Sequence, residues 1–287
     1  MQQMALWGYL ESLRSNCGYD EIYFNLAATQ TQMNWIEDDH PDITINTPRG
    51  QTLTISSAKT HGAIYNYSRA IAINPFSRDA YSFLGNIFLQ RQPQYTEKAK
   101  MLFRQAVHFF PIEKDFWVNL AYLQIQAREF AEARQSLVQA LSIDALYPLT
   151  QRNLQVYLRE NSAANDPLFE AEKKMLELDS LIAAKNWNQL KSNAEKLVEI
   201  LPRNFRFRVI LGNVYSELKE WSKAEKEYQS AYEMDDSNPA LLQNLAIAYR
   251  AQNKWEQAKS IIQILVDRNP NDPHYADMLK QFSQIPH

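Results

Sequence analysis

Large, small and aromatic side chains return in one order along this chain. The clearest copy begins with the large Leu211, the small Gly212 and the aromatic Tyr215. It continues with the small Ala224, the aromatic Tyr228 and the small Ala231. Steps of three and four residues within each half predict two helices, each with one apolar face. Small residues at 212 and 224 let the two helices approach closely, and the large ones fill the remaining space. The pattern therefore predicts antiparallel helix pairs.

The pairs recur at a regular distance. Trp187, Trp221 and Trp255 lie 34 residues apart, and each precedes by three residues an apolar position of the second helix of a pair. Further copies have these landmarks: Leu245–Ala246 with Tyr249, Leu84–Gly85 with Phe88, and Leu120–Ala121 with Phe130. A first copy is split between Leu26–Ala27 and Ala63. Five copies make chance spacing in a generic helical bundle a poor explanation.

This period and this order of residues resemble the tetratricopeptide repeat. The resemblance covers roughly residues 20–35, 58–145 and 171–270. It implies an all-α fold, a right-handed superhelical solenoid of antiparallel helix pairs (helix A, then helix B), here in two stacks. The resemblance is informative for the fold and weak for function, because this family binds many unrelated partners.

Two interruptions predict the domain organisation. Alternating β-branched residues around a Pro-Arg-Gly turn predict a loop or small hairpin inserted at about 36–57. No helix B follows the helix expected at 149–160; residues 161–167 are Asn-Ser-Ala-Ala-Asn-Asp-Pro, where Asp166 can cap a new helix that starts with Pro167. We expect these parts: an N-terminal helix in 1–19, a first stack in 20–160 that ends in a capping helix at 149–160, a linker in 161–167, and a second stack in 168–287 with its own C-terminal capping helix.

Composition and charge narrow the class of partner. The formal net charge is −3. The sequence therefore lacks the surplus of basic residues that would indicate a nucleic-acid partner. The single cysteine, Cys17, excludes an internal disulfide and a cysteine-cluster metal site. No stretch reaches the roughly 18 apolar residues of a membrane span, and the N-terminus lacks a signal peptide. We therefore expect a cytoplasmic protein, or a periplasmic one if the chain is a fragment of a membrane protein.

Catalytic motifs are missing from the sequence. It contains no Gly-rich phosphate loop, HExxH or GxSxG. His40 and His61 flank the insert near the acidic run 37–39, which raises the possibility of a metal site. A solvated acidic loop with ordinary surface histidines is the favoured interpretation. We expect no cofactor, no bound metal and no enzyme activity.

The resemblance implies that helix A lines a concave groove, where asparagines clamp the backbone of a bound peptide. The candidate clamps are Asn86 with Asn119 and Asn213 with Asn244, each pair reaching across neighbouring repeats. Helix-A positions also place Phe24 and Tyr122 in the groove, while Arg206 and Arg250 favour an acidic ligand. The lysines with which chaperone-binding members grip a terminal carboxylate are missing, because Val209 and Ser82 stand in their places.

These features predict a non-catalytic scaffold or adaptor that binds an extended peptide or a partner domain. An alternative is the tetratricopeptide portion of a larger membrane-bound enzyme, such as an O-antigen-ligase-like glycosyltransferase. The length of the native gene distinguishes the two. A free-standing enzyme that uses the insert is a third possibility, against which the missing motifs count.

Overall fold

The computed structural model describes residues 2–15, 19–38, 42–46, 52–55, 61–161 and 166–283, and most of them are helical. Within them lie fifteen helices and one two-stranded sheet. The expected all-α architecture of antiparallel helix pairs is confirmed. Contacts divide the chain into two compact units, residues 1–136 and 137–287.

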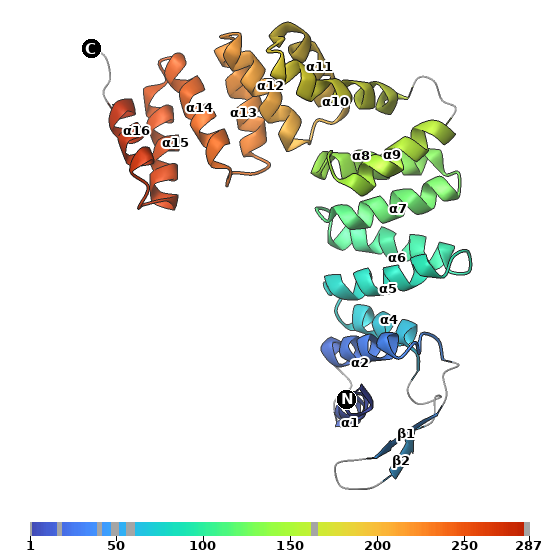
Figure 1. Ribbon diagram of the computed structural model, residues 1–287. Coiled ribbons are helices and arrows are strands. Elements are labelled where there is room, and N and C mark those ends of the chain that lie inside the picture. The colour runs from blue at the N-terminus through green and yellow to red at the C-terminus, as the bar shows by residue number, and fades with distance from the viewer. Residues whose placement is uncertain are drawn as a thin grey trace. The chain divides into compact units, whose positions relative to one another are not determined.

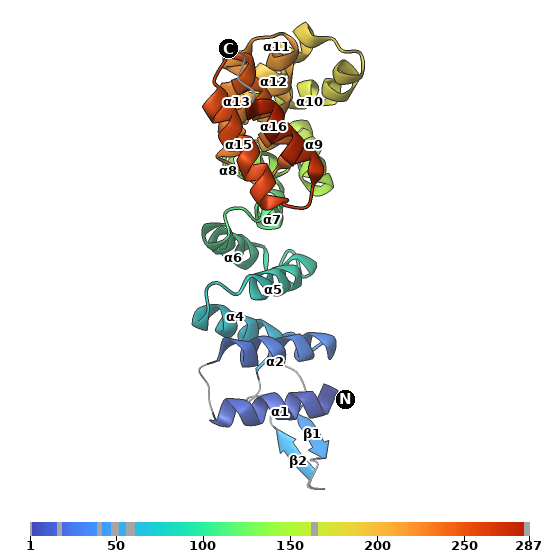
Figure 2. The same ribbon diagram turned by 90° about the vertical axis from the view of Figure 1, so that its left-hand side faces the viewer.

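Unit 1 is a stack of helices, each in contact with the next along the chain (Figures 1 and 2). Its elements are α1 (Gln2–Ser15), α2 (Asp20–Gln32), β1 (Ile43–Asn46), β2 (Thr52–Ile55), α4 (Ala63–Ile73), α5 (Arg78–Gln90), α6 (Thr96–Phe109) and α7 (Lys114–Gln126). Helices α2, α5 and α7 are the A helices, and α4 and α6 are B helices. Helix α8 (Phe130–Ile143) begins in unit 1 and ends in unit 2.

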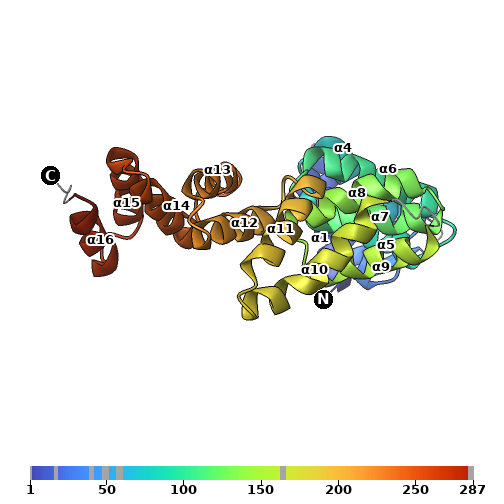
Figure 3. The ribbon, with the colours of Figure 1, turned by 90° about the horizontal axis from the view of Figure 1, so that it is seen from above.

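Unit 2 repeats the arrangement, and Figure 3 shows its helices α12 to α16 following one another in a row. Its elements are α9 (Pro148–Glu160), α10 (Pro167–Ala183), α11 (Trp187–Ile200), α12 (Phe205–Glu217), α13 (Trp221–Tyr232), α14 (Pro239–Ala251), α15 (Trp255–Arg268) and α16 (Pro273–Ser283). The A helices are α10, α12 and α14, and the B helices are α11, α13 and α15. Helix α16 packs on α15 at the expected capping position, with Phe282 buried.

The small residues of the repeat lie where two helices touch. A Cβ atom on Gly212 would lie 2.5 Å from the ring of Tyr228, and one on Gly85 would lie 2.5 Å from the ring of Phe103. Ala224 is fully buried. Each aromatic ring of helix B thus fills the space that a missing side chain on helix A leaves free, which confirms the register of the repeat.

The turn from helix A to helix B has the same form in five of the pairs. One residue there has a positive φ, and these residues are Asn34, Arg128, Lys185, Lys219 and Asn253. In the α12–α13 turn the N–H of Glu220 then donates to the carbonyl of Tyr215, at 2.8 Å. This hydrogen bond closes the C-terminus of helix A by a Schellman-type turn.

The insert is a hairpin spliced into the first turn of a B helix. Strands β1 and β2 pair in antiparallel fashion, with Ile43 opposite Ile55. In the uninterrupted α12–α13 pair the N–H of Ala224 donates to the carbonyl of Glu220, four residues earlier. At the equivalent position of α4 the N–H of Ala63 donates to the carbonyl of Trp35, on the other side of the insert, at 3.0 Å. The residues before the insert therefore supply the carbonyls that α4 lacks within its own chain segment.

The break between the units lies earlier than the linker expected at 161–167. Asn204, at the start of α12, donates from Nδ2 to the carbonyl of Leu141 in α8. Tyr157 of α9 donates to Asp166, the N-cap of α10. These hydrogen bonds join the end of α8 and the whole of α9 to the second unit, so α9 does not simply cap the first stack. Residues 162–165 lie outside the described part.

Candidate functional site

A hollow of about 320 Å³ opens on the helix-A groove of unit 2, the surface formed by α10, α12 and α14. Helix α12 forms most of its wall with Ile210, Asn213, Val214 and Glu217. Their spacing of three, four and seven residues places them on one helical face. The other principal lining residues are Ile182 of α10, Trp187 and Leu190 of α11, Tyr228 of α13 and Asn244 of α14.

Asn213 and Asn244 are joined at the rim of this hollow. Nδ2 of Asn244 donates to Oδ1 of Asn213 at 3.0 Å, and the hydroxyl of Tyr228 donates to the same oxygen at 2.8 Å. Burial raises the pKa of the Tyr228 hydroxyl, which therefore remains a donor at neutral pH. With its oxygen occupied twice, Asn213 offers its amide N–H groups to a ligand, whereas Asn244 offers its oxygen.

The two arginines expected in this groove have partners within the chain. Nη2 of Arg206 lies 3.1 Å from Oδ1 of Asp179 on α10. The guanidinium of Arg250 lies 4.6 Å from the centre of the Phe282 ring on α16. Arg206 therefore has an acidic partner on the neighbouring A helix, and Arg250 contacts the C-terminal helix.

The predicted residues of unit 1 are less organised. Asn86 on α5 is exposed and Asn119 on α7 is half-buried, and within the described residues no hydrogen bond joins them. Tyr122 is 37% exposed. Phe24 instead packs edge-on against Tyr67, with ring centres 5.6 Å apart, and belongs to the margin of the core.

The described part of the insert's neck places His61 beside Asp38. Nδ1 of His61 lies 3.3 Å from Oδ2 of Asp38, and its ring stacks on Tyr65. Among the described residues no group of three His, Cys, Asp or Glu side chains could hold a metal ion. His40 and Cys17 lie outside the described residues.

Sequence reasoning missed several residues of the groove. Trp187 was interpreted only as a landmark of the repeat, and Glu217 was not considered, although it follows Ile210 by seven residues on the same helical face. Phe83 in unit 1, which is 46% exposed and contacts Phe24, was also overlooked. A systematic count of helix-A face positions would have found Glu217 and Phe83.

The structure defines a class of protein, the helical repeat proteins built from antiparallel pairs. Two family models, both described as tetratricopeptide repeat, match residues 115–145 and 224–282. Over these residues the chain contains tetratricopeptide repeats. No curated protein matches it in sequence. No helix among the described residues has the length and apolar character that crossing a membrane requires.

Solved structures similar to this chain include several tetratricopeptide proteins. One from Parabacteroides merdae is 12% identical with a TM-score of 0.41, over 98% of this chain and 91% of that chain. YrrB, described as having an unusual peptide-binding site, is 13% identical with a TM-score of 0.35, over 75% and 97%. The tetratricopeptide domain of P58(IPK) is 12% identical with a TM-score of 0.45, and the match covers 77% of this chain and 59% of that chain.

Proposed function

We propose that this protein is a non-catalytic adaptor that holds an extended segment of a partner protein in the helix-A groove of unit 2. The observation that carries the proposal is the hydrogen-bonded pair Asn213 and Asn244 beside a hollow that is in part apolar. An amide pair of this kind binds a peptide backbone whatever its sequence, and the hollow beside it can receive one side chain.

The geometry of the pair indicates how the segment would be held. Neighbouring A helices are about 10 Å apart, which by itself predicts contacts about three residues apart on an extended ligand. The side chains of Asn213 and Asn244 instead meet at 3.0 Å. They therefore present one donor and one acceptor side by side. An extended residue offers its carbonyl and N–H on the same side, so the pair would hold a single ligand residue.

Hydrogen bonds alone would make a weak complex. Each contributes only about 1 kcal/mol net, and association costs entropy before any surplus is measured. Burial of a ligand side chain against Trp187, Ile210 and Leu190 would add affinity of the usual apolar kind. The amide pair would thus set the register of the ligand, and the hollow would provide most of the free energy of binding.

The experiment is a selection of short random peptides displayed on phage against the whole chain, followed by affinity measurement with a labelled selected peptide. The double change Asn213→Ala with Asn244→Ala should weaken binding about 30-fold, the equivalent of two hydrogen bonds at about 1 kcal/mol each. Fluorescence polarisation measures the dissociation constant, and circular dichroism confirms that the helices persist.

A matched control is available in unit 1. Asn86→Ala with Asn119→Ala removes two asparagines from equivalent A-helix faces and should leave the affinity unchanged. If the unit 1 pair weakens binding and the unit 2 pair does not, the groove of unit 1 is the binding site. If neither pair matters, the peptide binds elsewhere on the molecule, and the proposal for unit 2 is wrong.

A further inference from the structure

Glu217 contributes the only charged side chain among the residues that line the hollow of unit 2, as far as the structure describes them. It is exposed, and no ion pair to its carboxylate is found within the described residues. This distinguishes it from two nearby carboxylates. Glu220, in the adjacent turn, lies 2.6 Å from both Lys191 and Lys223, and Asp179 is paired with Arg206.

The rest of the hollow combines apolar side chains with the amides of Asn213 and Asn244 and the hydroxyls of Ser216 and Tyr228. Ile182, Trp187 and Ile210 bring side chains from three helices to its wall. Its volume of about 320 Å³ is at the lower end of the roughly 300–1,000 Å³ typical of ligand pockets. Such a space suits one long side chain better than a whole domain. It combines hydrocarbon walls with one negative charge and an indole ring, against which cations are favoured.

We infer that the hollow selects a lysine or arginine side chain of the bound segment, with its aliphatic stem against Trp187 and Ile210 and its charged end at Glu217. This inference rests on the proposed function and names the chemistry of its ligand. The backbone of that residue would be held by Asn213 and Asn244 at the rim. Glu217 would then be a specificity-determining residue of the groove.

The inference reverses the ligand charge expected from the sequence. That expectation relied on Arg206 and Arg250, whose guanidinium groups already have partners in Asp179 and Phe282. Asp179 offsets the charge of Arg206, so this arginine adds little attraction for an acidic ligand. Arg250 keeps its charge, but its guanidinium group is directed at the Phe282 ring and does not line the hollow. The unpaired carboxylate in the hollow is the charge that a ligand would meet.

The test uses pools of peptides that are random except for one central position, which holds lysine, arginine, norleucine or glutamate. Norleucine keeps the hydrocarbon stem of lysine and lacks its charge. Retention of each pool on the immobilised whole chain is measured. The lysine and arginine pools should be retained about fivefold better than the norleucine pool, as a partly exposed ion pair allows. The preference should fade near 1 M salt, where screening reaches about 3 Å.

Two variants assign the preference to its residue. Glu217→Gln should abolish the preference for lysine and arginine over norleucine, and Glu217→Lys should transfer it to the glutamate pool. Glu256→Gln, which neutralises an exposed carboxylate on α15 away from the hollow, should change nothing. Circular dichroism of each variant verifies that the fold is retained.

The outcomes separate this inference from the function on which it rests. If all pools are retained equally, while Asn213→Ala with Asn244→Ala lowers retention of all of them, the groove binds peptides but Glu217 does not select them. If the preference survives in Glu217→Gln, the inference is also wrong. Retention of no pool by the unaltered chain would contradict both the inference and the proposed function.

Discussion

Tyr228 serves the core and the groove at once. Its ring occupies the space above Gly212, and its hydroxyl donates to Asn213. A change that moves the ring must therefore also move the hydroxyl, which orients the amide of Asn213. At this residue the stability of the helix pair and the geometry of the proposed clamp depend on the same side chain.

Replacing Gly212 tests this dependence. In Gly212→Ala the new Cβ would approach the ring of Tyr228 to 2.5 Å, closer than real atoms allow, so the ring or the helix must shift. We expect a loss of about 1–3 kcal/mol in the free energy of unfolding, as for other overpacked cores. The midpoint of urea denaturation, followed by tryptophan fluorescence, measures it.

The control is Gly8→Ala on α1, where nothing lies within 4 Å of the added Cβ. Alanine is the better helix former by about 1 kcal/mol, so this variant should be unchanged or slightly more stable. An unaltered midpoint for Gly212→Ala would show that the contact between α12 and α13 is looser than described.

At the scale of elements, one ion pair recurs between consecutive repeats. It joins a residue in the first turns of a B helix to the residue that ends the next A–B turn, 29 positions later: Lys100 with Glu129, Lys191 with Glu220, and Glu225 with Lys254. The last pair has the opposite polarity. A repeat with glutamate at the start of its B helix is complementary to a following repeat with lysine at the end of its A–B turn. Because the polarity differs between pairs, the charges favour one order of repeats over another.

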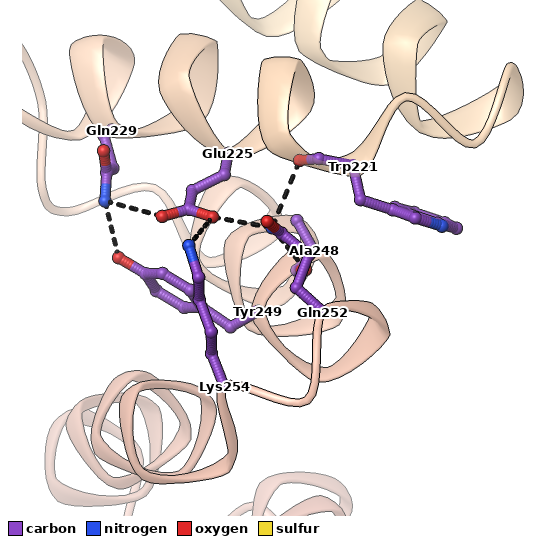
Figure 4. Close-up of polar contacts among 7 residues, drawn as sticks. All are labelled: Trp221, Glu225, Gln229, Ala248, Tyr249, Gln252 and Lys254. Atoms are coloured by element: carbon purple, nitrogen blue, oxygen red, sulfur yellow. Dashed lines mark hydrogen bonds and ion pairs between the residues drawn. The ribbon is translucent and has the colours of Figure 1, made fainter.

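Figure 4 shows that Glu225 is the centre of a larger cluster. Its carboxylate accepts from Lys254 at 2.5 Å and from Gln252 at 2.6 Å, and Gln229 bridges it to the hydroxyl of Tyr249. Helix α13 supplies Glu225 and Gln229, whereas Gln252 and Lys254 lie in the turn between α14 and α15. The cluster therefore connects one helix pair to the next. Its side chains are only partly exposed, which protects the bonds from competing water.

Reversing the charges of Glu225 and Lys254 tests how much the ion pair itself stabilises the contact between the two repeats. Glu225→Lys and Lys254→Glu should each lower the free energy of unfolding by about 1 kcal/mol, because each places like charges together. The double variant should recover part of that loss, since the ion pair is restored while the bonds from Gln252 and Gln229 to Glu225 are not. A double-mutant cycle on urea midpoints measures the coupling. A coupling energy of zero would mean that the ion pair has no part in the contact between repeats.

Across the whole molecule, buried tyrosines link stability to alkaline pH. Burial raises the pKa of Tyr67 and Tyr81 in unit 1 and of Tyr215 and Tyr228 in unit 2. For Tyr215 the carboxylate of Glu195 adds to the effect. A raised pKa in the folded state means that stability is fully present below the unfolded value of about 10 and is lost as the pH rises above it.

We therefore expect the urea midpoint to fall above about pH 10, with tyrosinate absorbance increasing as the helical signal disappears. Tyr228→Phe cannot ionise at that position, so its midpoint should depend less steeply on pH in this range, whatever its stability at pH 7. If the four tyrosines ionise near pH 10 while the helices remain intact, their hydroxyls are accessible to water and this explanation is wrong.

The fold could be predicted from the sequence because the small and large residues at 212, 224 and 228 report directly on the contact between two helices. The pairing of Asn213 with Asn244 could be anticipated for the same reason, as both positions recur with the repeat. The partners of Arg206 and Arg250 could not, because long side chains choose among partners on other helices by rotamer and by local charge. The hydrogen bond from Asn204 to Leu141 could not be predicted either, because it spans 63 residues of sequence.

The hairpin inserted between α2 and α4 leaves the two sides of the A–B turn joined by hydrogen bonds. Ala63 and Ile64 donate to the carbonyls of Trp35 and Ile36, and Gly62 donates to the side chain of Asp38 at 2.7 Å. A Cβ on Gly62 would lie 2.4 Å from the carbonyl oxygen of Glu37, so only glycine allows the two ends to come so close.

These contacts hold the helix turn together across a gap in sequence, through hydrogen bonds instead of a peptide link. We expect the length of the polypeptide between the two ends to be variable at small cost to the pairing of α2 with α4, because each doubling of loop length costs only about 0.6 kcal/mol. The first repeat is thus held together at this point by hydrogen bonds between two separate segments of the chain. We expect this position to tolerate the insertion of a foreign segment or a division of the protein into two chains.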